Sequence, residues 1–209
     1  REPFGPLVRI PGLRRVGGLL TTPAARLLFP RRRREENSHV RVRPIKRFDE
    51  RADQLWRKMR RAVSLATDRG SAYLNWRLAE NPLPYEMQAA EAGAQLLGYV
   101  APRGEERFGM RLGYIVDLLF DDDHQDVSGL LLAKSLESLR SQDCAMAIAL
   151  SGERGPLREA LRRGGFRRLP PWLLPHGMHF CVKDRGGMMQ DGPPPERQWF
   201  LSWSDHDVV

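Results

Sequence analysis

Four consecutive runs between Tyr114 and Leu150 decide the fold that we expect: YIVDLLF (114–120), DDDHQDVSG (121–129), LLLAKSLESLRSQ (130–142) and DCAMAIAL (143–150). The first and last runs are short and apolar, which is typical of buried strands. The second run is acidic and polar and predicts a loop, whereas the third places leucines and alanines at helical spacing. We therefore expect a strand–helix–strand unit with a right-handed crossover. The free N–H groups and the dipole of its helix favour an anion such as a pyrophosphate.

The charge of the chain is unevenly distributed. The formal net charge is +8 over 209 residues, but residues 1–47 carry +10 and residues 48–209 carry −2. This split argues against a nucleic-acid interface spread over the whole protein. No apolar run approaches the ~20 residues of a membrane span, so we expect a cytoplasmic protein.

Residues 1–38 are predicted to form a basic arm or linker, because proline, glycine and the run Arg31–Arg34 interrupt every short apolar stretch. Attachment to an anionic membrane surface or to nucleic acid is one alternative, and such binding would weaken steeply with salt. An Arg-rich, acid-poor targeting peptide is another. We expect that deleting residues 1–38 leaves the folded core intact. The chain begins with Arg rather than Met, which suggests an upstream domain.

The remaining chain is predicted to be one α/β domain over 39–184, followed by a loop and tail at 185–209. The domain has an α+β order that predicts a twisted, mixed β-sheet flanked by helices. The expected elements are an edge strand at 39–48, a helix from Asp49 to about Ala66, a short helix capped by Ser71, strands at 85–91, 95–102 and 110–120, a turn at 103–107, the central unit, a helix at 155–163, and strands at 166–174 and 178–183.

This order resembles the GNAT-type acyl-CoA-dependent N-acetyltransferases, including bacterial members linked to polysaccharide gene clusters. The resemblance covers about residues 39–184. It rests on YLNWR at 73–77 followed by Asn81-Pro82, on the hairpin and the IVDLLF strand that enter the central helix, and on LREALRRGGFRRL at 157–169. Some relatives contain two such modules, which would account for an upstream GNAT-like domain.

The resemblance implies an acetyl-CoA or other acyl-CoA cofactor. Its pantetheine arm would lie between the fourth and fifth strands of the family's sheet, here against Leu118, Leu119 and Phe120. Its pyrophosphate would lie on the amides around Gln125, Ser128, Gly129 and Leu130.

The pyrophosphate loop departs from the family pattern of Gln or Arg, two residues, Gly, one residue, then Gly or Ala. Gly129 falls one place late, and Leu130 stands where a small residue is expected. Asp121, Asp122, Asp123 and Asp126 add negative charge where a polyanion would bind. We expect weak acetyl-CoA binding, toward the millimolar range. The acidic run is more typical of a solvated face than of a metal site.

The acceptor implied by the resemblance is an amine-bearing small molecule. Asp117 interrupts an apolar strand beside the expected cleft and is the candidate general base, with an ion pair to an arginine as the alternative role. Trp76 and Arg77 on the short helix, and Ser151 at a strand end near the mouth of the cleft, are the candidate acceptor-binding residues. Arg77 has Glu80 or Asp117 as alternative ion-pair partners.

Three functions therefore stay open. The first is a GNAT-like N-acyltransferase with a degenerate pyrophosphate loop. The second is a catalytically inactive GNAT-fold module that supports an upstream domain. The third is docking to an anionic surface or nucleic acid through the basic arm.

Overall fold

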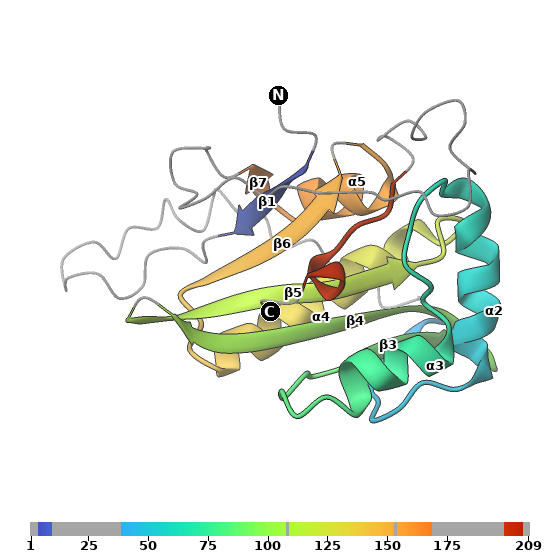
Figure 1. The fold of residues 1–209 in the computed structure, drawn as a ribbon, viewed down its shortest axis with the longest axis horizontal. Coiled ribbons are helices and arrows are strands. Elements are labelled where there is room, and N and C mark those ends of the chain that lie inside the picture. The colour runs from blue at the N-terminus through green and yellow to red at the C-terminus, as the bar shows by residue number, and fades with distance from the viewer. Residues whose placement is uncertain (1–3, 10–38, 108, 153, 169–198, 207–209) are drawn as a thin grey trace, which may run out of the picture.

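A seven-stranded mixed sheet forms the centre of the molecule, with the strand order β2-β3-β4-β5-β6-β1-β7 (Figure 1). The computed structural model describes residues 4–9, 39–107, 109–152, 154–168 and 199–206. The elements are β1 (Phe4–Arg9), β2 (Arg41–Pro44), α2 (Glu50–Met59), η1 (Arg60–Ala62), α3 (Ser71–Leu74), the π-helical turn η2 (Asn75–Ala79), β3 (Gln88–Ala92), β4 (Gln95–Arg107), β5 (Met110–Phe120), α4 (Gln125–Ser141), β6 (Met146–Gly152), α5 (Pro156–Arg163), β7 (Arg167–Arg168) and η5 (Trp203–Asp205).

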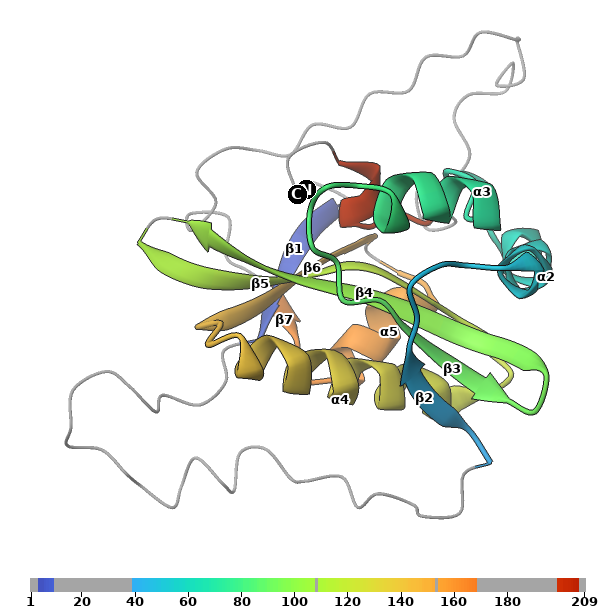
Figure 2. The same cartoon turned by 90° about the horizontal axis from the view of Figure 1, so that it is seen from below.

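Helices cover both faces of this sheet. Figure 2 shows α4 and α5 on one face, and α2, α3 and η5 on the other. Each face has its own apolar core, which explains why Leu112–Phe120 is buried continuously rather than at alternate positions. Within the described residues, no helix is long and apolar enough to cross a membrane.

The predicted strand–helix–strand unit is confirmed. β5 and β6 are neighbouring parallel strands, and α4 connects them. The helix begins at Gln125 rather than at Leu130, so most of the predicted acidic loop is helical. Val127 is fully buried in the core beneath α4, and Asp126 lies in the first helical turn, where a carboxylate interacts well with the helix dipole.

The predicted arm contains a strand. β1 lies antiparallel between β6 and β7, so the expectation of an arm without secondary structure is wrong at Phe4–Arg9. Pro6 is compatible with this position because β7 pairs only with Leu7 and Val8, which leaves one side of Pro6 outside the ladder. Residues 10–38 lie outside the described chain, as does the strand predicted at 178–183.

Three element boundaries differ from the prediction. The first helix of the domain ends at Met59 and continues only as the 3₁₀ turn η1. The N-cap of α3 is Gly70 rather than Ser71. The carboxylate of Asp53, in α2, accepts hydrogen bonds from the Ser71 amide at 2.7 Å and from the Ser71 hydroxyl at 2.8 Å. These two bonds join α2 to α3.

The third boundary is the turn expected at 103–107, which is instead the end of β4. Gly109, with φ of 72°, lies in the connection to β5 and supplies the left-handed backbone.

We expect the Val8→Pro substitution to lower the free energy of unfolding by roughly 2–3 kcal/mol, because proline removes a backbone donor from a strand paired on both sides. Val8 pairs with Ile148 of β6 and Arg167 of β7. Urea unfolding measures the effect, and Val8→Thr is the matched control because it keeps the N–H group and the β-branched shape. Equal stability of the two variants would show that β1 does not pair in solution.

Candidate active site

A β-bulge in β5 marks the place where this strand separates from β6. Ala101 of β4 pairs with Asp117 and Pro102 pairs with Ile115, so Val116 is the additional residue. The parallel pairing of β5 with β6 ends at Ile115–Ala149, although β6 continues beside β1 as far as Gly152. Because a bulge bends a strand and increases its twist, β5 and β6 diverge from residue 116 onward.

The bulge also determines where Asp117 points. Val116 belongs to the core beneath α2 and α3, and Leu118 belongs to the core beneath α4. The Asp117 side chain, between them, contacts Tyr99 and Arg69 on the same face as Val116. Two consecutive side chains therefore lie on the α2/α3 face, because the extra residue interrupts the alternation of the strand.

Asp117 is a fully buried carboxylate in an ion pair. Its Oδ2 accepts a hydrogen bond from the Tyr99 hydroxyl at 2.8 Å and lies 3.4 Å from Nε of Arg69. Burial, followed by the neighbouring Asp117 charge, raises the pKa of Tyr99 well above its usual value, so its hydroxyl remains a donor. Pairing with an arginine is thus the role that the structure shows, and a role as general base remains a prediction.

Arg69 is the centre of the network around Asp117 and is itself fully buried. Its Nη1 donates to the Thr67 carbonyl at 2.8 Å, and its Nη2 donates to Oγ of Ser202, Oγ of Ser204 and Oδ2 of Asp205 at 3.1, 3.0 and 2.6 Å. No sequence pattern selected Arg69, because Asp68-Arg69-Gly70 looks like a helix-breaking turn.

Two carboxylates keep the Arg69 guanidinium charged inside the protein. Burial opposes the charge, but Asp117 and then Asp205 outweigh it, so the pKa of Arg69 is raised above its usual value. The rings of Tyr73 and Phe200 lie 5.9 and 5.0 Å from the guanidinium carbon and add cation–π contacts.

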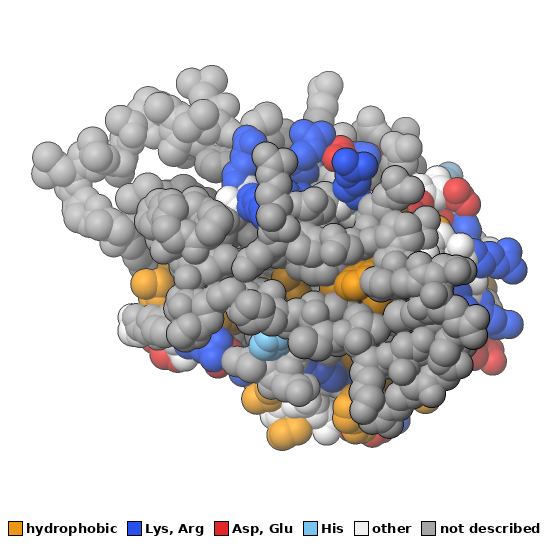
Figure 3. All heavy atoms as spheres, turned by 45° about the horizontal axis from the view of Figure 1, so that its top comes forward, with side chains coloured by type: hydrophobic (Ala, Val, Ile, Leu, Met, Phe, Trp, Pro, Cys, Tyr) orange, Lys and Arg blue, Asp and Glu red, His pale blue; other side chains and the backbone are white. Residues whose placement is uncertain are grey.

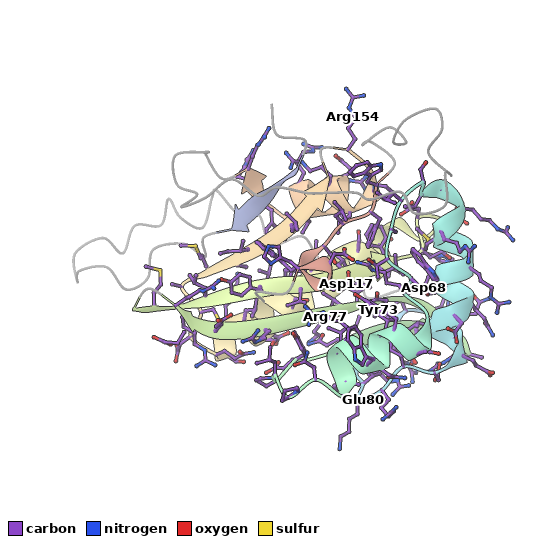
Figure 4. The ribbon with its side chains drawn as sticks, in the orientation of Figure 1. Asp68, Tyr73, Arg77, Glu80, Asp117 and Arg154 are labelled. Atoms are coloured by element: carbon purple, nitrogen blue, oxygen red, sulfur yellow. The ribbon has the colours of Figure 1, made fainter. Side chains whose placement is uncertain are left out.

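The last described residues of the chain, Trp199–His206, cover this network; we call them the C-terminal segment. Ser202 and Asp205 form a capping box around η5. Arg77 donates from Nε to the Ser204 carbonyl at 3.0 Å and from Nη2 to the His206 carbonyl at 2.9 Å. Figure 4 shows Asp117, Tyr73 and Arg77 converging between α3, β5 and this segment, whereas Arg154 points outward from the far side.

The other two acceptor candidates do not join this cluster. Trp76 is 65% exposed and contacts the Tyr73 ring at 5.8 Å. Ser151 is buried, and its hydroxyl donates to the Gly152 carbonyl, so it does not lie at an open cleft mouth. Glu80 and Asp117 were the alternative ion-pair partners expected for Arg77. In the structure, Asp117 pairs with Arg69 and Glu80 pairs with Arg47.

Leu118, Leu119 and Phe120 form the buried end of β5, and the loop at 121–124 connects them to α4. Nζ of Lys58, from α2, lies 2.7 Å from Asp121 and 2.6 Å from Asp123. The expectation that these aspartates act as uncompensated charges is therefore too simple, because one lysine pairs with two of them.

The residues expected to surround a pyrophosphate lie in the first turns of α4. Gln125 is the first residue of the helix, Ser128 is buried, Gly129 is exposed and Leu130 is half-buried. In the preceding loop, the Asp123 amide donates to the Asp121 side chain and the His124 amide donates to the Asp121 carbonyl. Those two amides are occupied, so an anion would have to bind to the amides that follow them.

Several solved acetyltransferases share this architecture at low similarity. An aminoglycoside acetyltransferase from an uncultured soil metagenomic sample has 12% identity and a TM-score of 0.46, covering 71% of this chain and 99% of its own. A ribosomal-protein-alanine N-acetyltransferase from Brucella melitensis has 15% identity and a TM-score of 0.41, covering 51% and 75%. An acetyltransferase from Trypanosoma brucei has 12% identity and a TM-score of 0.44, covering 68% and 99%.

These likenesses concern the fold alone and carry no argument about activity. No family model matches the chain, and no curated protein matches it. The mixed sheet flanked by helices and the parallel crossover from β5 through α4 to β6 are as the sequence predicted, whereas the position of β1 between β6 and β7 was not predicted.

The core of this chain depends on residues that sequence reasoning missed. Arg69, Lys58 and the C-terminal segment carry no local motif, and the acidic partners of Arg69 and Lys58 lie 48 to 136 positions away. The available signal was chemical: an Asp inside an apolar strand requires a buried cation, and serines beside an acid in an aromatic tail can satisfy a guanidinium.

We expect Arg69→Met to lower the free energy of unfolding by about 3–5 kcal/mol, because it leaves Asp117 and Asp205 without their cation. Arg47→Met is the matched control, since Arg47 forms an exposed ion pair with Glu80 and should cost less than about 1 kcal/mol. Urea unfolding of both variants measures the difference. Similar costs for the two substitutions would contradict a buried ionic network.

Asp122 provides a pH-dependent prediction. Burial and then the charges of Asp121 and Asp123 raise its pKa to about 6, and its Oδ1 is buried without a hydrogen-bond partner. A raised carboxyl pKa adds stability below about pH 4 that is lost as the pH rises through 6. Asp122→Asn should therefore stabilise the protein at pH 7, by about 1 kcal/mol after allowing for solvent screening, and have little effect at pH 4.

Thermal unfolding of the wild type and of Asp122→Asn between pH 4 and pH 7 measures this effect. Glu137→Asn, on the exposed face of α4, should show no such pH dependence. A constant difference between Asp122→Asn and the wild type across this range would contradict the raised pKa.

Proposed function

We propose that the chain is a GNAT-like N-acyltransferase that transfers an acetyl or other acyl group from acyl-CoA to an amine. The observation that carries the proposal is the divergence of β5 from β6 at the Val116 bulge, immediately before the start of α4. In the reaction, the amine nitrogen would form a bond to the thioester carbonyl carbon, the C–S bond would break, and the amine would give up a proton.

The divergence supports cofactor binding because it leaves backbone groups available. Among the described strands, β4 alone pairs with Leu118–Phe120. Buried N–H and C=O groups require partners, and the amides of a pantetheine arm have the spacing and chemistry of a neighbouring strand. Leu118, Leu119 and Phe120 are therefore the residues proposed to bind it.

The start of α4 supports phosphate binding, but weakly. The helix dipole favours an anion there, and Lys58 offsets part of the charge of the loop. The ion pairs of Lys58 are with Asp121 and Asp123, so they leave the charges of Asp122 and Asp126 in the loop, and Leu130 adds bulk in the second turn of the helix. We therefore propose Gln125, Ser128, Gly129 and Leu130 as a degenerate pyrophosphate site.

Two other functions keep specific support. A non-catalytic supporting module is favoured by the ion pair that holds Asp117 under the C-terminal segment. Docking to an anionic surface through the basic arm is the other alternative. Figure 3 shows Lys and Arg side chains gathered on one face of the molecule, and exposed arginines of α5 and β7 would add positive charge to such a contact. Measurement of thiol release from acetyl-CoA with amine acceptors separates the enzyme from both.

Calorimetric titration with acetyl-CoA tests the cofactor site. We expect wild-type affinity toward the millimolar range and at least tenfold tighter binding, about 1.4 kcal/mol, when Asp122→Asn and Asp123→Asn are combined. The double variant removes two charges from the loop and leaves Lys58 paired with Asp121 alone. Adding Leu130→Gly should tighten binding further, because glycine lets the backbone approach the phosphates.

The matched control combines Glu106→Gln and Glu137→Gln, which removes the same two charges from exposed positions at the far end of β4 and the middle of α4. Its affinity should equal that of the wild type. Micromolar binding by the wild type would show that the loop is not degenerate, and no binding by any variant would favour the non-catalytic module.

A further inference from the structure

The C-terminal segment is held in the way that a protein holds a peptide. The Phe200 amide donates to the Leu65 carbonyl at 2.9 Å, and Leu65 forms an isolated parallel bridge with Trp199. The Ser204 carbonyl accepts from Arg77 at 3.0 Å and from the Tyr73 hydroxyl at 3.3 Å. These contacts are made to main-chain atoms, so they would hold other extended sequences equally well.

Two side chains give the segment its specificity. Trp203 is 9% exposed and lies edge-on against the Tyr114 ring, with a centroid distance of 5.8 Å. Asp205, two residues later, places Oδ2 2.6 Å from Nη2 of Arg69. A buried aromatic anchor and a carboxylate on an arginine are the elements that dominate peptide recognition.

The fit between the segment and its surroundings is incomplete. Nε1 of Trp203 and Oδ1 of Asp205 are buried at this contact without a hydrogen-bond partner, and Nε of Arg69 has only its ion pair with Asp117 at 3.4 Å. A cavity of about 50 Å³ also borders Phe200 and Leu201, opposite Gly155 and Leu157. Buried polar atoms in native cores are nearly always satisfied, so two orphans on the segment itself favour an exchangeable occupant over an optimised core.

We propose that the surface formed by Leu65, Arg69, Tyr73, Arg77 and Tyr114, the peptide seat, is a binding site for an acidic peptide that ends in a 3₁₀ turn, and that the C-terminal segment is its internal occupant. The ligand class is a peptide with a large aromatic residue followed two positions later by a carboxylate. The seat lies against Asp117 and the bulge, so its ligand would be the acceptor or would lead to it. That last step rests on the proposed function, whereas peptide binding itself does not.

Hydrogen exchange on the unmodified chain tests whether the segment is exchangeable. The amides of Phe200 and Asp205 are hydrogen-bonded, as are those of β5. If the segment leaves the seat by a local opening, its amides should exchange at least tenfold faster than those of Leu112 and Gly113, which pair with both β4 and β6. Equal protection of both sets would show that the segment is a fixed part of the core and would overturn the proposal.

Peptide binding tests the seat directly. A fluorescein-labelled peptide with the sequence of residues 199–206, WFLSWSDH, is titrated against the full chain in the absence of acyl-CoA. Trp203→Ala in the chain removes the anchor of the internal occupant but leaves the seat intact, so it should bind the peptide at least tenfold more tightly than the wild type. The same peptide with Asp205→Asn should bind at least tenfold more weakly.

Met110→Ala is the matched control, because Met110 is a large exposed apolar residue at the start of β5 that is not among the residues of the peptide seat. It should bind the peptide as weakly as the wild type. A folded Trp203→Ala chain with wild-type affinity would overturn the proposal. Peptide binding without acetyl-CoA binding would refute the proposed enzyme and leave the seat standing, so the two failures are distinguishable.

Discussion

The arrangement of the α2/α3 face of the sheet depends on the ion pair between Arg69 and Asp117, whose side chains are both fully buried. A guanidinium taken out of water is tolerated only where its charge and its donors are satisfied. Those partners come from three separate parts of the chain: β5 supplies Asp117, the turn before α3 supplies Thr67, and the C-terminal segment supplies Ser202, Ser204 and Asp205. Satisfying one cation therefore fixes the positions of three segments.

The β-bulge at Val116 makes this ion pair possible. In a regular strand, Asp117 would point to the face opposite Val116, into the apolar core beneath α4, where no cation is described. The extra residue turns the carboxylate toward Arg69 and, at the same point, separates β5 from β6. One irregularity in one strand thus produces both the buried network and the opening in which a cofactor is proposed to bind.

The sequence predicted what depends on local periodicity. The order of elements, the parallel crossover, the N-cap at Asp49 and the hairpin between β3 and β4 follow from residues close together in the chain. The features that it did not predict depend on pairing between residues far apart in the sequence. The strand at Phe4–Arg9 has a proline and a weak pattern and becomes a strand only beside β6, and Arg69 resembles a turn residue until Asp117 and Asp205 are placed around it.

The sequence likewise predicted only part of the candidate site. Asp117 was selected because a lone carboxylate in an apolar strand is unusual and points to a specific role. Pairing with an arginine was one of the two roles considered. The identity of that partner was not predictable, because a sequence that contains thirty-four basic residues offers many choices and only the folded backbone selects one. Ser202 and Asp205 were passed over for the converse reason, since short polar residues near a chain end carry no periodic signal.

The same network constrains the chemistry that Asp117 can perform. While the C-terminal segment is seated, water is excluded and the attraction between Asp117 and Arg69 acts in a medium of low dielectric. If the segment leaves as proposed, Arg69 would lose Asp205 and gain water, which would screen its attraction for Asp117. Occupancy of the peptide seat would therefore change the electrostatic surroundings of Asp117, because Asp205 of the segment and Asp117 pair with the same arginine.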